Sequence, residues 1–228
     1  MGEERAEWMH RYSRQIILPQ IGGVGQKKLQ TSHLCLVGAG AVGYPFFLYG
    51  SGSGIQQWTL LEPDPSLAER LVKEARRRDP SITVTVLPFA HLADTLNSGL
   101  QTGQWSAVVE ASNDFAIHHK VVTLCHRQPT PLHTAWLSAG IGWLACSPCP
   151  CSLPPPSTSP HRASPFEAMG MGLIGTQLAQ QVILTILGNN PTEKKAPWQG
   201  FQLESGTFST QQANCGPECP TCRDGSTP

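Results

Sequence analysis

The chain has 228 residues, 39% of them hydrophobic, which is enough for one large domain that buries roughly 70% of its unfolded surface without a disulfide. Its 16 basic and 16 acidic residues cancel, and this balance argues against a nucleic-acid binder, which would show a basic excess or stripe. Charged residues make up only 14% of the chain, a shortage that favours a surface partly covered by another subunit.

The N-terminal residues predict a helical arm. The opening stretch, MGEERAEWMHRYSRQ, is charged and lacks the apolar core of a secretory signal, so we expect a soluble, cytoplasmic chain. In that reducing compartment the cysteines are thiols or metal ligands rather than disulfides. Residues 7–31 have the pattern of an amphipathic helix and a turn, interrupted by glycines.

Strands and helices then alternate. Apolar runs predict strands at 33–37, 57–61, 82–87, 107–110 and 131–135, with helices after Gly43 and at 67–79. This alternation is typical of a parallel, doubly wound sheet. The fold class we expect is α/β, with a doubly wound, mainly parallel, Rossmann-like sheet.

The amino-acid composition changes at Cys146. Residues 146–165 are rich in Pro, Ser and Cys and predict a crossover loop. A helix follows at 166–187, whose Gly, Thr and Gln make it a poor membrane span, and a strand-like stretch follows at 200–208. We expect a single domain over 1–228 with the parts 1–31 (helical arm), 32–145 (nucleotide-binding-type core), 146–165 (crossover loop) and 166–228 (helix, strand and Cys-rich zinc tail).

A glycine-rich loop stands between the first strand and its helix. Gly38, Gly40 and Gly43 form G-x-G-x-x-G, whose backbone can approach phosphates at a helix N-terminus. Glu62, at the end of the second strand, is placed to accept hydrogen bonds from a ribose. The alternative is a tight turn whose glycines serve packing only, in a fold that has lost its ligand.

Cysteine pairs occur in the crossover loop and in the tail. Four thiolates are the expected ligands of one structural Zn²⁺: Cys146, Cys149, Cys219 and Cys222. Cys151 is an alternative to Cys146, and unmetallated surface thiols are the alternative to the whole site. Cys35 and Cys125 stand in apolar runs and are expected to be buried packing residues.

The segment RYSRQIILPQIGGVGQKKLQ, the loop LVGAGAVG and the tail CPTC are, in order and spacing, closely similar to the MoeB/ThiF/HesA-type adenylyltransferases, relatives of the ubiquitin-activating enzymes. The resemblance extends from about residue 11 to 222. It implies a dimer that binds ATP and Mg²⁺ and adenylates the C-terminal glycine of a ubiquitin-like or sulfur-carrier protein. It also implies that Arg14 reaches into the partner's ATP site.

The sequence departs from the family where the family holds phosphates. The family's SNLxRQ segment and GxxK lysine are missing, because the chain passes from Glu62 and Asp64 almost directly into a helix. Arg70 or Lys73 could substitute, but a solvated helix face is the favoured interpretation of both.

The family's magnesium aspartate is also replaced. Asn113 stands at that position, and an amide oxygen is a poorer Mg²⁺ ligand than a carboxylate; Asp114 could compensate only through a rearranged loop. His118 stands where the family has arginine. No cysteine beyond Cys151 lies in the interval where thioester-forming members place theirs, so a covalent carrier thioester is not expected.

Three functions compete. The favoured one is a carrier-activation protein with a degraded adenylation site, acting as a homodimer or heterodimer subunit or as a pseudoenzyme, with Arg14 acting in trans. The second is an active, minimal ATP-dependent adenylyltransferase that uses Glu62, Asp64 and Asp114. The third is an NAD- or FAD-binding oxidoreductase, which RYSRQ and the CxxC tail argue against.

Overall fold

The computed structural model describes residues 2–126, 128–138, 140–146, 166–189 and 198–211. The first helices and strands are α1 (Gly2–Ile16), α2 (Gly22–Thr31), β1 (His33–Val37), α3 (Gly43–Gly52), β2 (Gln57–Leu61), α4 (Pro65–Arg78) and β3 (Thr83–Leu87). After a short 3₁₀ turn come α5 (Leu92–Gln101), β4 (Ala107–Glu110), α6 (Phe115–Cys125), β5 (Leu132–Ser138), β6 (Ile141–Cys146), α7 (Glu167–Leu187), β7 (Trp198–Gln202) and β8 (Thr207–Gln211).

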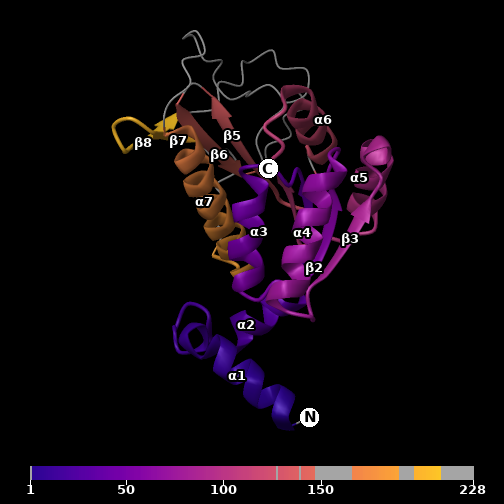
Figure 1. Ribbon diagram of the computed structural model, residues 1–228, viewed down its shortest axis with the longest axis vertical. Coiled ribbons are helices and arrows are strands. Elements are labelled where there is room, and N and C mark those ends of the chain that lie inside the picture. Colours follow the sequence, from indigo (N-terminus) through magenta and orange to yellow (C-terminus); the bar gives the residue numbers. More distant parts are fainter. Residues whose placement is uncertain (1, 127, 139, 147–165, 190–197, 212–228) are drawn as a thin grey trace, which may run out of the picture.

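One sheet runs through the whole molecule in the order β3-β2-β1-β4-β5-β6-β7-β8 (Figure 1). The strands from β3 to β5 pair in parallel, which confirms the Rossmann-like half of the expected fold. From β5 to β8 the pairing is antiparallel, so the sheet is mixed. The sequence analysis predicted no strand at β6, which pairs antiparallel with β5 and follows Gly140, a residue with a positive φ of 74°.

Helices cover both faces of the sheet. On one face α3, α4 and α7 enclose a core that includes Phe46, Phe47 and Trp58. On the other face α5 and α6 pack over Trp105 and the strand residues beside it. Neither α5 nor α6 was predicted as a helix. The carboxyl ends of the parallel strands meet at the upper edge in Figure 1, where α3 and α6 begin.

The N-terminal arm lies at the opposite edge. α2 leads directly into the amino end of β1, and α1 packs where α3 ends. Gln26 Nε2 donates to the Ser53 carbonyl, and a Cβ on Gly54 would lie 3.3 Å from the buried Tyr12 ring. The arm is therefore anchored a full helix length, roughly 15 Å, from the first turn of α3.

α7 has the length and apolar composition of a membrane-spanning helix, with a third of its most apolar window buried. It packs closely on α3: a Cβ on Gly175 would lie 2.5 Å from the Val42 carbonyl oxygen. Ile174, Leu178 and Val182 are fully buried against the sheet. These contacts are those of a core helix that covers β5 and β6.

Candidate functional site

The glycine loop joins β1 to α3 and packs directly on the loop that follows β4. Gly38 has a φ of +92°, and a Cβ there would lie 2.5 Å from the Ser112 Cα. A Cβ on Gly43 would lie 1.9 Å from the Gly38 carbonyl oxygen. By contrast, a Cβ on Gly40 would meet nothing within 4 Å. Packing explains the first and third glycines, whereas the second leaves open space beside the backbone, as a phosphate-binding loop requires.

Glu62 closes this loop from the neighbouring strand. Its Oε2 accepts a hydrogen bond from the Ala39 N–H at 2.5 Å, and its Oε1 accepts one from the Asp64 N–H at 2.8 Å. The side chain is largely buried and lines a cavity of about 740 Å³ between α4, β3 and the turn at Phe89. Glu62 thus lies where a ribose acceptor was predicted, but it already holds two backbone donors.

Asp64 acts as the N-cap of α4. It accepts hydrogen bonds from the Ser66 N–H at 2.8 Å and the Ser66 hydroxyl at 2.7 Å, and these bonds lower the pKa of Asp64. With Pro65 at the first helical position, α4 begins two residues earlier than predicted. Only Glu62, Pro63 and Asp64 connect β2 to α4.

Two cations of α4 have different surroundings. The Arg70 guanidinium lies 4.0 Å from the centre of the Tyr44 ring, in the first turn of α3. Lys73 forms an exposed ion pair with Glu69 at 2.8 Å and lowers the pKa of that carboxyl. Of the two cations that could substitute for the missing phosphate contacts, Arg70 lies beside the glycine loop's helix.

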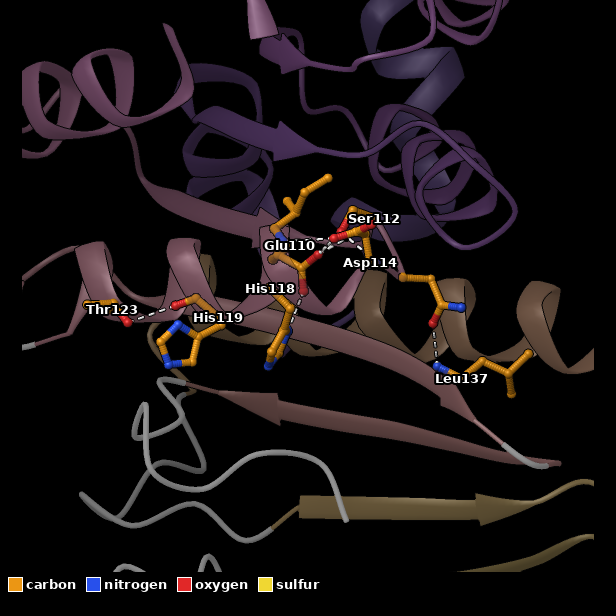
Figure 2. A network of polar contacts seen from close by, with 9 residues as sticks. Glu110, Ser112, Asp114, His118, His119, Thr123 and Leu137 are labelled. Atoms are coloured by element: carbon orange, nitrogen blue, oxygen red, sulfur yellow. Dashed lines mark hydrogen bonds and ion pairs between the residues drawn. The ribbon is translucent and has the colours of Figure 1, made fainter. Parts of the chain in front are cut away.

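In the loop after β4, both candidate metal ligands, Asn113 and Asp114, already accept hydrogen bonds from backbone N–H groups (Figure 2). Asn113 has a φ of +57°, a left-handed conformation that Asn adopts readily, and its Oδ1 accepts a hydrogen bond from the Leu137 N–H at 2.8 Å. Asp114 is the N-cap of α6 and accepts from the Ile117 N–H at 2.9 Å. Both roles are structural: Asn113 ties the loop to β5, and Asp114 caps α6.

Beneath this loop lies a buried pair that the sequence analysis did not find. Glu110 is the last residue of β4 and His118 lies on α6, with side chains 0% and 1% exposed. Glu110 Oε2 lies 2.6 Å from His118 Nδ1, and Glu110 Oε1 accepts from both the Ser112 N–H and the Ser112 hydroxyl (Figure 2). The only available sequence signal was a carboxylate at the end of an otherwise apolar strand.

The remaining predicted residues do not join this edge. Arg14 is exposed in the last turn of α1, at the far edge of the sheet. Cys146 ends β6 and is buried, with its Sγ 3.7 Å from His133 Nε2. The other expected zinc ligands, Cys149, Cys219 and Cys222, and the alternative Cys151 lie outside the described residues. The zinc site therefore stays a prediction.

Comparison with known proteins supports the resemblance. The sequence model of the ThiF family matches residues 12–65. The chain is 29% identical over 207 residues to the Aedes aegypti protein named adenylyltransferase and sulfurtransferase MOCS3, covering 79% of this chain and 47% of that protein. The chain thus spans about half the length of that relative. It is 24% identical to the Haloferax volcanii SAMP-activating enzyme E1, covering 96% of this chain and 91% of that enzyme.

Solved structures share the fold. Escherichia coli MccB with ATP superimposes with a TM-score of 0.71 at 17% identity, covering 94% of this chain and 75% of that chain. The structure titled SeMet PaaA gives a TM-score of 0.66 at 14% identity, with 91% and 74% coverage. Taken with the RYSRQ segment and the glycine loop, the family-model match and the curated relatives support a member of the MoeB/ThiF-type adenylyltransferase family, and the solved structures show the shared fold.

Proposed function

We propose that the chain acts in the activation of a ubiquitin-like or sulfur-carrier protein, as a dimer subunit whose own adenylation site is degraded. We expect it to do so in the cytoplasm. The observation that carries this proposal is the state of four carboxylates at the ends of β2 and β4. Each accepts hydrogen bonds from its own chain: Glu62, Asp64, Glu110 and Asp114.

These residues do not fit a preformed magnesium site. Mg²⁺ demands near-octahedral oxygen ligands and usually takes one or two carboxylates. Among the residues that the structure describes, no group of three or more His, Cys, Asp or Glu is arranged to hold a metal ion. Recruiting Asn113 or Asp114 would compete with the bonds that shape the loop and cap α6.

The same edge does fit a nucleotide. The open space beside Gly40, in the loop that leads into α3, suits phosphate groups, and the cavity beside Glu62 suits the nucleoside. Bound ATP would supply the adenylyl group for adenylation, with pyrophosphate as the leaving group. The chain's residues would bind and orient it: the glycine loop would face the phosphates, and Glu62 keeps free lone pairs for hydroxyl donors.

The shortage of cations near the proposed phosphate site favours slow adenylyl transfer. Removing one preorganised charge-stabilising donor typically costs about 3 kcal/mol of barrier, or roughly a hundredfold in rate. Lys73 is paired with Glu69, which leaves Arg70 as the nearest of the two candidate cations. Nucleotide binding therefore survives this loss more readily than adenylyl transfer does.

The position of Arg14 supports a dimer. α1 lies at the opposite edge of the sheet from the glycine loop, so Arg14 lies away from this chain's own site, which suits a role in another chain's site. Beside the arm, an apolar cavity of about 740 Å³ opens between α3 and α7, and Ile17 and Tyr49 nearby are 76% and 56% exposed. Exposed apolar surface of this kind marks an interaction site. A second ThiF-type chain is the occupant that we propose.

ATP–pyrophosphate exchange tests the proposal. The isolated chain should give no exchange above background, with or without carrier proteins that end in glycine. Together with an active homologue and its carrier, the chain should support exchange that is lost in Arg14→Ala and retained in Lys27→Ala, an exposed cation on the same arm. Robust exchange by the chain alone would establish the second candidate, an active minimal adenylyltransferase, which the Arg70–Tyr44 contact favours.

A further inference from the structure

We propose that the buried Glu110–His118 pair is a positioning device for the nucleotide loop: it holds Ser112 against Gly38 and thereby sets the shape of the phosphate cradle. This inference rests on the proposed nucleotide site and adds to it two residues that do not touch the ligand. The chain of contacts runs from α6 through β4 to the glycine loop.

The first link is the carboxylate itself. Glu110 is fully buried, and its two oxygens receive three donors: the Ser112 N–H at 2.9 Å, the Ser112 hydroxyl at 2.5 Å and, with the proton on Nδ1, the His118 ring at 2.6 Å. A buried carboxylate is stable only when such donors surround it. The His118 ring is in turn fixed by edge contact with Trp136, at 5.6 Å between ring centres.

The second link is the backbone of Ser112. The Ser112 hydroxyl also accepts from the Asp114 N–H at 3.2 Å, so the serine joins Glu110 to the N-cap of α6. On its other side, the backbone of Ala111 and Ser112 fills the space where a Gly38 Cβ would stand, at 2.5–2.8 Å. The glycine loop therefore rests on the residue that Glu110 holds.

The third link is the rest of the 112–114 loop, whose other two residues are also fixed by hydrogen bonds. Asn113 is tied to Leu137 across to β5, and Asp114 is tied to the first turn of α6. If the hydrogen bonds between Glu110 and Ser112 are lost, we expect Ser112 to shift against Gly38, because Asn113 and Asp114 are held by their own hydrogen bonds. Phosphate cradles bind well only when their amides are held in place before the ligand arrives.

The test compares variants that are expected to lower the free energy of unfolding by similar amounts, some beside the glycine loop and one in the middle of β2. Glu110→Gln keeps the size of the side chain and removes its charge, and Ser112→Ala removes the hydroxyl links. The matched control is Thr59→Val. Thr59 is equally buried in the middle of β2, away from the loop, and its hydroxyl accepts a hydrogen bond from Trp105 and is hydrogen-bonded to His33 Nε2. Unfolding midpoints and ATP dissociation constants in EDTA are measured for each.

Glu110→Gln and Ser112→Ala should each raise the dissociation constant about tenfold, and the double variant should raise it no further, because both act through one link. His118→Gln, which keeps a donor towards Glu110, should lose less affinity than His118→Leu. Thr59→Val should leave the dissociation constant unchanged. An unchanged constant in Glu110→Gln, or an equal rise in Thr59→Val, overturns the proposal.

Hydrogen exchange in the ligand-free protein separates this inference from the proposed function. Glu110→Gln should speed exchange of the Ala39 and Ser112 amides about tenfold, and Thr59→Val should not. If the wild-type chain binds no nucleotide but the exchange pattern holds, the positioning role stands and the proposed nucleotide site fails. If nucleotide binds and exchange at both amides is unaffected, the positioning role fails.

Discussion

Gly40 and Gly43 offer the sharpest test of what the glycine loop is for. A Cβ on Gly43 would lie 1.9 Å from the Gly38 carbonyl oxygen, a backbone atom of the loop that packs on Ser112. Overpacking of this kind costs about 1–3 kcal/mol or more, so Gly43→Ala should lower the unfolding midpoint by about 2–4 °C for each kcal/mol. Its nucleotide affinity is uninformative, because the fold itself is strained.

Gly40→Ala should behave in the opposite way. Nothing lies within 4 Å of its added Cβ, and its φ is not in the left-handed region, so the alanine should leave stability unchanged or raise it by about 0.4–1 kcal/mol. The same methyl group would stand where a phosphate approaches the backbone, so ATP affinity measured by calorimetry should fall at least tenfold, about 1.4 kcal/mol. A Gly40→Ala chain that is stable and binds ATP as well as wild type would refute a phosphate-binding role for the loop.

Three further predictions follow from the site and the cysteines. Arg70→Ala should weaken ATP binding several-fold in a filter-binding or calorimetric assay, whereas Lys73→Ala, which removes a cation already paired on the same helix, should not; equal losses would contradict the assignment. Elemental analysis should find one zinc per chain, lost in Cys219→Ser, and retention of zinc in Cys146→Ser would assign the first pair to Cys149 and Cys151 instead. Because burial raises the pKa of Cys125 to about 12, this thiol should resist iodoacetamide at pH 8 until the chain unfolds, and labelling in the native state, read by peptide mass spectrometry, would show that α6 opens.

The strand pattern could be predicted well because each central strand is a short, continuous apolar run. The strands at 33–37, 57–61 and 107–110 have the predicted bounds, since parallel strands covered on both faces need apolar side chains throughout. α5 and α6 escaped prediction. α6 places His118 and Thr123 among its apolar residues, and the reason for His118 is a partner on β4 that no local pattern reveals.

The candidate site was predictable in position but not in detail. Gly38, Gly43 and Glu62 meet where expected, because the end of one parallel strand lies beside the end of the next. What the sequence could not show is that Glu62 and Asn113 are already bonded to neighbouring backbone. These bonds depend on the register of β2 and β4 against β1 and on one left-handed residue, which are tertiary facts.

The three-residue connection between β2 and α4 limits which mutations could restore the family's phosphate-binding segment. Asp64 caps the helix and Pro65 fixes its first turn, so no exchange of one amino acid for another can recreate a segment that is not there. A longer loop at this surface position would cost little conformational entropy, about 0.6 kcal/mol for each doubling of its length. On the proposed function, recovery of adenylyl transfer requires inserted residues, and a graft between Pro63 and Asp64 is the laboratory equivalent of that event.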